Sequence, residues 1–217
     1  MGWTTRCIAL VALVGCGTRI SEDPPDPLEV DTDTDTDTDT DTDTDSDTDS
    51  DADTDTDPTG MGTVIISEIV DNADFAGAKF IELYNGSSDT VELSGWQVRR
   101  YANGGTSSQD VDLGGFMAPG AVRVIAGGSG FDDAYGFGAD QYDGAVSGNG
   151  NDVYELYSGL QTIDLYGQIG TDGTGTVWDY EDSVVVRNSG VILGNPGFDI
   201  SEWTLTPGAG SATPGVH

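Results

Sequence analysis

Carboxylates are the side chains of this sequence that could support the widest range of chemistry. Glu68 and Glu82 occupy similar positions in two apolar segments, Thr63–Val70 and Lys79–Tyr84, so paired strands would place them face to face. A facing pair of carboxylates is the catalytic arrangement of many glycosidases. The alternative, which we favour, is that both glutamates point outward or lie on edge strands of an acidic domain.

Other catalytic groups are scarce. The single histidine is His217, so a buried Ser-His-Asp or Cys-His pair has no base inside the domain. A zinc site would have neither cysteine nor histidine ligands. Ser129 lacks the second glycine of a nucleophile elbow, and the only lysine, Lys79, lies in a predicted strand rather than in a phosphate loop. We therefore expect a protein that is not an enzyme, with a hydrolase based on acidic residues as the less favoured alternative.

Aspartates in the predicted loops are candidate calcium ligands. Calcium takes six to eight oxygens at about 2.3–2.6 Å, and loops can supply both carboxylates and carbonyls. The candidate ligands are Asp71, Asp74, Asp132, Asp133 and Asp152. Diffuse screening of the negative charge by salt is the alternative that we favour, so we expect no cofactor and leave calcium open.

These side chains must be positioned by strands, because the sequence after Gly60 is a series of short β-branched and aromatic segments separated by Gly, Asn and Asp. No convincing helical window is present. The number of short strands predicts an all-β fold, an immunoglobulin-like β-sandwich. The expected strands are Thr63–Val70, Lys79–Tyr84, Val91–Leu93, Gly95–Tyr101, Asp110–Leu113, Ala121–Ala126, Asp152–Tyr157, Gln161–Tyr166 and Ser183–Arg187.

Two further groups of residues have both a functional and a structural interpretation. The glycine-rich segments Gly127–Asp132 and Gly148–Asp152 resemble half-turns of a calcium β-roll, but they are not in tandem, so we expect turns between strands. Large aromatic residues could form a surface for a glycan or a protein, although core packing is their more frequent role. These aromatic residues are Trp96, Trp178, Tyr180 and Trp203.

Several segments resemble the lamin tail domain of bacterial secreted proteins. The matching sequences are VIISEIV at 64–70, FIELYN at 80–85, VELSGW at 91–96, APG at 118–120, VRVI at 122–125, GNGND at 148–152 and IDLYGQIG at 163–170. The resemblance covers residues 63–217. It implies an immunoglobulin-like module that attaches its host to other molecules, so the implied partner is a surface protein or a glycan.

The N-terminal residues are typical of an export signal. Arg6 is their only charge, and the apolar run Cys7–Val14 is far shorter than the roughly 20 residues that a membrane-spanning helix needs. The sequence LVGC at 13–16 resembles the bacterial lipobox, which implies cleavage before Cys16, lipidation of Cys16 and attachment to the membrane. Gly17 implies the outer membrane, so we expect an outer-membrane lipoprotein of the bacterial cell envelope that is exposed at the surface.

An acidic repeat follows. Between Ser21 and Asp57 there are eighteen acidic and no basic residues, mostly as an Asp-Thr alternation without the apolar residues of a core. We expect a disordered tether that holds counterions loosely rather than a calcium site. The expected organisation is a signal peptide at 1–15, a tether at 16–60 and a β-sandwich domain at 61–217.

The charge balance disfavours nucleic acid as a partner. The whole chain has a formal net charge of -32, and residues 62–217 contain twenty-one acidic and five basic side chains. Such a domain repels phosphate overall.

Overall fold

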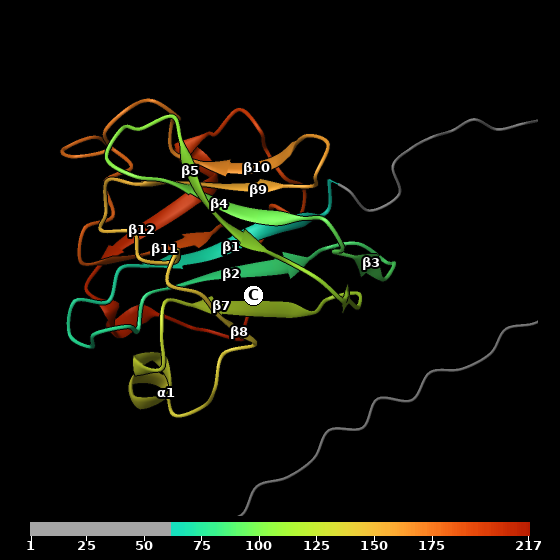
Figure 1. Ribbon diagram of the computed structural model, residues 1–217, viewed down its shortest axis with the longest axis horizontal. Coiled ribbons are helices and arrows are strands. Elements are labelled where there is room, and N and C mark those ends of the chain that lie inside the picture. The colour runs from blue at the N-terminus through green and yellow to red at the C-terminus, as the bar shows by residue number, and fades with distance from the viewer. Residues whose placement is uncertain (1–61) are drawn as a thin grey trace, which may run out of the picture. The chain divides into compact units, whose positions relative to one another are not determined.

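The computed structural model describes residues 62–217 (Figure 1). The predicted signal peptide, the predicted tether and Cys16 lie outside the described residues. The strands are β1 (Val64–Val70), β2 (Phe80–Asn85), β3 (Val91–Glu92), β4 (Gln97–Tyr101), β5 (Ser108–Asp112), β6 (Phe116–Met117), β7 (Val122–Ala126), β8 (Gln141–Tyr142), β9 (Val153–Tyr157), β10 (Thr162–Tyr166), β11 (Ser183–Arg187) and β12 (Trp203–Pro207). The helical segments are α1 (Gly130–Tyr135) and the 3-10 helices η1 (Ile200–Glu202) and η2 (Ala209–Ser211).

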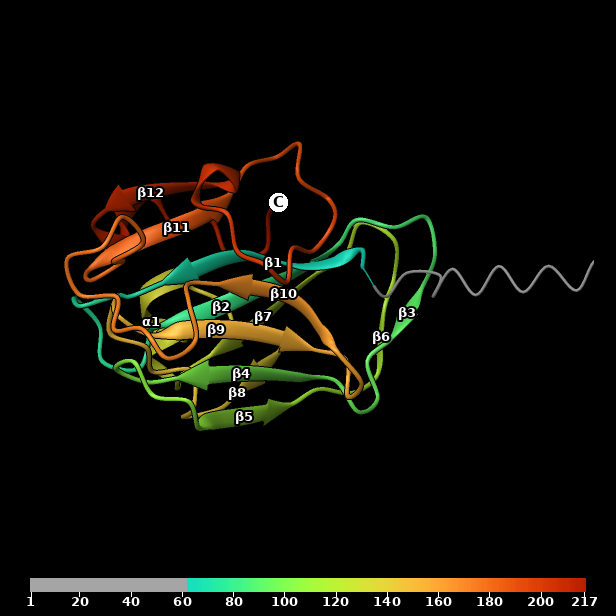
Figure 2. The same cartoon turned by 90° about the horizontal axis from the view of Figure 1, so that it is seen from above.

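Two sheets form a sandwich. The larger sheet has the order β12-β11-β1-β2-β7-β8, and the smaller sheet has the order β10-β9-β4-β5. All pairs in these sheets are antiparallel except β7 with β8. Figure 2 shows the smaller sheet on one side of the larger one and the short β3–β6 pair at one end. The predicted all-β sandwich is confirmed.

The main apolar core lies between the two sheets. Ile66 and Ile81 from the larger sheet and Leu156 from the smaller one are fully buried in it. Burying one such side chain stabilises the fold by about 1.5–3 kcal/mol. Core packing is confirmed for the four aromatic residues considered above, because each is at most 6% exposed, and these residues are Trp96, Trp178, Tyr180 and Trp203.

The outer face of the larger sheet is covered as well. Phe80 of β2 packs edge-on against Phe131 of α1, with ring centroids 5.5 Å apart, and Val124 of β7 joins the same cluster. A strand of this sheet therefore buries both of its faces, which accounts for the near-continuous burial of β2.

A β-bulge at Ser67 decides which side chains of β1 enter the core. The pairing of β1 with β2 shifts register between Ile66 and Glu68. Ile66 faces the core before the bulge and Ile69 faces it afterwards. Unbroken alternation would place Glu68 on the core face with Ile66, so the bulge is what turns Glu68 to the outer face.

The secondary structure differs from the expectation at helix α1 and at three strands. The segment Gly127–Asp132 was expected to be a turn, but helix α1 begins inside it, at Gly130. Six residues are too few for a helical period, and a Cβ at Gly130 would lie 1.9 Å from the carbonyl oxygen of Ala76, so close approach rather than helix propensity explains this glycine. Strands β6, β8 and β12 were not expected. The closing Pro207 of β12 is tolerated because β12 is an edge strand.

Candidate functional site

Glu68 and Glu82 lie directly opposite each other in the pairing of β1 with β2. The prediction that these strands bring the two glutamates together is confirmed. Of the favoured interpretation, the outward position holds, because both side chains lie on the outer face of the larger sheet. The edge position was wrong, because β1 and β2 are interior strands, and neither glutamate is exposed, at 1% and 0%. The sequence pattern carried no sign of the chain segment that covers them.

Residues 208–217, which we name the strap, provide that cover. The backbone N–H of Thr213 donates to Oε1 and Oε2 of Glu68 at 3.0 and 3.3 Å. The backbone N–H of Gly215 donates to Oε2 of Glu82 at 2.6 Å. In Figure 1 the C-terminal mark accordingly lies over β2 and β7. Both carboxylates are thus bound by main-chain donors of one segment.

Side-chain contacts also hold the glutamate pair and the strap in place. The hydroxyl of Ser67 donates to Oε1 of Glu82 at 2.7 Å, which leaves neither oxygen of Glu82 without a donor. The ring of His217 lies on that of Tyr84, with centroids 4.3 Å apart. Ala212 packs on the apolar cluster of the outer face.

Burial governs the protonation of this pair. Loss of hydration raises the pKa of Glu68 to about 7, and the negative charge of Glu82 adds to the increase, whereas the Thr213 amide opposes it. The pKa of Glu82 also rises to about 7 through burial, against the opposing hydrogen bonds of Ser67 and Gly215. Two carboxyl groups with such pKa values could move protons near neutral pH, but a substrate cannot reach them while the strap covers them.

The five calcium candidates are dispersed. Asp71 forms an ion pair of 2.7 Å with Lys79, and Asp152 forms one of 2.6 Å with Arg100. Asp132 accepts a hydrogen bond from the hydroxyl of Tyr142. The remaining two, Asp74 and Asp133, are exposed to solvent.

Within residues 62–217, no three His, Cys, Asp or Glu side chains converge on a position suited to a metal ion. Asp71 and Asp152 neutralise buried or half-buried basic side chains instead. Diffuse screening stays the prediction, with specific calcium binding by these residues as its alternative.

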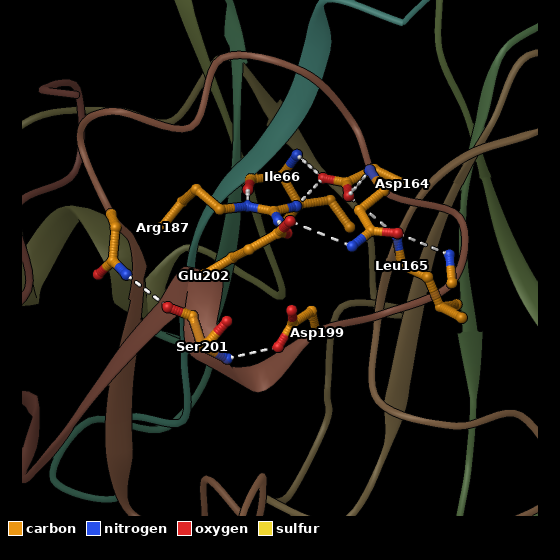
Figure 3. A network of polar contacts seen from close by, with 10 residues as sticks. Ile66, Asp164, Leu165, Arg187, Asp199, Ser201 and Glu202 are labelled. Carbon is orange, nitrogen blue, oxygen red and sulfur yellow. Dashed lines mark hydrogen bonds and ion pairs between the residues drawn. The ribbon is translucent and has the colours of Figure 1, made fainter.

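An ion-pair network centred on Arg187 was missed from the sequence (Figure 3). Arg187 ends β11 and is 1% exposed. Its guanidinium contacts Asp164 of β10 and Glu202 of η1, and its Nε donates to the carbonyl of Ile66 at 3.3 Å. The guanidinium also lies 3.9 Å from the ring centre of Trp203. A basic residue at the end of the apolar segment SVVVR was the only local signal for it.

The carboxylate of Asp164 is surrounded by hydrogen-bond donors. It accepts backbone N–H bonds from Ile66 at 2.8 Å, Leu165 at 3.1 Å and Asn195 at 2.9 Å, besides the contact with Arg187. Burial raises the pKa of Asp164, while the Arg187 charge lowers it. In every one of these contacts an N–H group donates a hydrogen bond and the carboxylate accepts it, so the arrangement suits the ionised form.

A hollow of about 370 Å³ lies beside this network. It is lined by residues 190–195 of the β11–β12 connection and by Glu202, and we name it the 190–195 hollow. Ile192 and Leu193 are 46% and 59% exposed. Glu202 is the charged member of the Arg187 network that lines it, with a side chain that is 24% exposed.

Comparison with known proteins bears on the sandwich as a whole. A family model described as the Lamin Tail Domain matches residues 57–170, which span β1 to β10. The chain belongs to the lamin tail domain family. This family is immunoglobulin-like, in agreement with the two-sheet architecture.

The glutamate pair lies inside the matched part of this lamin tail domain protein, whereas Arg187, the 190–195 hollow and the strap lie beyond it. Strands β11 and β12 nevertheless belong to the larger sheet. No curated protein matches the chain. None of the helices between residues 62 and 217 has the length and apolarity that crossing a membrane requires.

Proposed function

We propose that this protein is a bacterial outer-membrane lipoprotein, anchored through lipidated Cys16, whose lamin tail domain attaches or scaffolds other molecules at the cell surface without catalysing a reaction. The observation that carries the proposal is the contrast between two sites. The strap covers the facing carboxylates of Glu68 and Glu82 and separates them from solvent. The 190–195 hollow, in contrast, is open to solvent and has exposed apolar side chains at its edge.

The N-terminal sequence supports the anchor. A short apolar run precedes Cys16. Acyl chains on Cys16 would insert into the membrane, and each buried CH₂ group would contribute roughly 0.8 kcal/mol to the free energy of membrane binding. We further propose that the acidic repeat between Cys16 and the domain serves as a tether, because its closely spaced like charges would repel one another. This arrangement suits contact with a surface protein or a glycan.

Fatty-acid labelling tests the anchor. Cells producing the full chain are labelled with radioactive palmitate, and the membrane fraction is compared with that of the variants Cys16→Ser and Cys7→Ser. We expect label in the wild type and in Cys7→Ser, whose substitution lies in the apolar run of the signal, and none in Cys16→Ser. Label that persists in Cys16→Ser contradicts the proposed anchor.

Attachment and catalysis are separated by one further experiment. Vesicles carrying the full chain are passed over immobilised envelope proteins and glycans from the producing cells. We expect saturable retention that free chain competes away, with the masses of the immobilised molecules unchanged. A cleavage product that disappears in the double variant Glu68→Gln, Glu82→Gln would favour the hydrolase alternative instead.

A further inference from the structure

We propose that the 190–195 hollow binds a lysine side chain of a protein partner, with the ammonium group on Glu202 and the aliphatic part of the side chain against Ile192 and Leu193. The inference rests on the attachment function proposed above and names the partner chemistry of that function. It is carried by charge, by the free positions on the Glu202 carboxylate and by the shape of the connection that forms the hollow.

Charge in the network is not balanced. The single guanidinium of Arg187 lies between the carboxylates of Asp164 and Glu202, so one negative charge is left over. Asp164 is fully buried and is surrounded by N–H donors. Glu202 is the carboxylate that lines the hollow, so a cation from outside would meet the excess charge there.

The carboxylate of Glu202 has free acceptor positions. Its Oε2 receives Arg187, and its Oε1 receives Nδ2 of Asn195 at 3.1 Å. Each carboxylate oxygen accepts about two hydrogen bonds, so single positions remain on both oxygens. An ammonium group can use either position alone as a point charge, whereas the planar fork of an arginine binds in its bidentate mode only where the two free positions are parallel.

The surroundings suit the rest of a lysine side chain. Ile192 and Leu193 provide exposed apolar surface beside the acidic group, which is what an aliphatic chain with a charged end requires. The volume of about 370 Å³ is near the lower end of ligand sites, enough for a single side chain.

The connection that forms the hollow is held in place before any partner binds. The N–H of Gly194 donates to the carbonyl of Gly62 at 2.7 Å, and the N–H of Val191 donates to that of Asn188 at 2.8 Å. Asn195 is fixed on Asp164 at 2.9 Å. Such preorganisation lowers the entropy lost on binding.

Long-range electrostatics favour the same partner. Residues 62–217 contain twenty-one acidic and five basic side chains, and four of the basic ones already lie in ion pairs with carboxylates of the domain. A lysine-bearing surface would therefore be attracted to this domain at low salt.

The test uses the full chain with labelled isoleucine and leucine methyl groups and three short peptides that differ only in a central lysine, norleucine or arginine. We expect the lysine peptide to shift the Ile192 and Leu193 resonances saturably, with an affinity at least tenfold above that of the other two. Equal responses to lysine and norleucine overturn the proposal, because the hollow would then recognise apolar surface alone. Equal responses to lysine and arginine overturn the choice of lysine.

Two variants and a matched control locate the binding. Glu202→Gln should weaken the lysine peptide at least tenfold, and Leu193→Ser should weaken it severalfold without touching the ion pairs. Glu181→Gln removes an exposed acidic group elsewhere and should leave the affinity unchanged. The Leu193→Ser result keeps the test decisive if Glu202→Gln fails to fold, and unchanged affinity in Leu193→Ser overturns the assignment.

Failure of this inference can be distinguished from failure of the attachment function. If vesicles bearing Leu193→Ser are retained on envelope material as well as the wild type, attachment holds and the hollow is not its site. If wild-type vesicles are not retained, the attachment function itself is wrong.

Discussion

The hydroxyl of Ser67 donates a 2.7 Å hydrogen bond to Oε1 of Glu82, and it does so from the β-bulge of β1. The bulge thus has two effects at one position. It turns Glu68 away from the core, and it places a donor beside the neighbouring glutamate. The remaining donors come from the strap, so two strands and a distant segment together hold the carboxylate pair.

The glutamate pair predicts a specific dependence of stability on pH. Burial raises the pKa of each carboxyl from 4.5 to about 7, so the folded state binds more protons than the unfolded state between these values. This contribution is fully present below pH 4.5 and is lost as the pH rises through 7. Urea unfolding from pH 4 to 8 should show a loss on the order of 3 kcal/mol per carboxylate.

Substitution identifies the source of that loss. Glu68→Gln and Glu82→Gln should each flatten the pH profile above pH 4.5, whereas exposed Glu181→Gln should retain it. His217 acts in the opposite direction, because burial lowers its pKa, and His217→Gln removes its contribution. A profile that is identical in the wild type and in both glutamate variants would refute the assignment.

The Arg187 network predicts a large loss of stability in Arg187→Met. The change leaves the buried carboxylate of Asp164 without its cation, and breaking a buried pair in this way costs about 3–5 kcal/mol. Arg123→Met should cost less than about 1 kcal/mol, because the guanidinium of Arg123 donates to the Gly114 carbonyl in an exposed contact. Urea denaturation measures both, and similar losses in the two variants would contradict a structural role for the network.

Close packing at Gly130 predicts a destabilised Gly130→Ala variant. The added methyl group would lie 1.9 Å from the Ala76 carbonyl oxygen, so backbone must move, and we expect a loss of roughly 2 kcal/mol or more. Gly114→Ala places its methyl group in open space and should change stability by less than about 0.5 kcal/mol. Thermal unfolding measures the stability of both variants. Equal stability of the two would contradict close packing at Gly130.

Calcium should act on this domain mainly through ionic strength. Asp71 and Asp152 are committed to ion pairs with Lys79 and Arg100, so we expect sodium and calcium to stabilise the full chain equally at matched ionic strength. Melting curves in the two salts measure this. A rise of many degrees at sub-millimolar calcium alone would show binding by mass action and would favour calcium-dependent adhesion to a matrix.

Local sequence was sufficient for the strands that carry strong β-branched and aromatic patterns. Segment 183–187 was predicted with the observed bounds. The prediction differs by one residue at the first end of β1 and by one residue at each end of β2. The juxtaposition of Glu68 with Glu82 also followed from the pattern, because both lie at equivalent places in consecutive strands. Neither inference needed knowledge of distant contacts.

The amino-acid sequence by itself determined the all-β class, most of the strands and the burial of Trp96, Trp178, Tyr180 and Trp203, since these depend on side-chain type and alternation along a few residues. Only the tertiary structure decided which face of β1 holds Glu68, because a bulge breaks the alternation at Ser67. It also decided that the strap, 145 residues away, covers Glu68, and that Arg187 meets Ile66 across 121 residues. Such contacts depend on how sheets and loops pack, which short-range patterns do not encode.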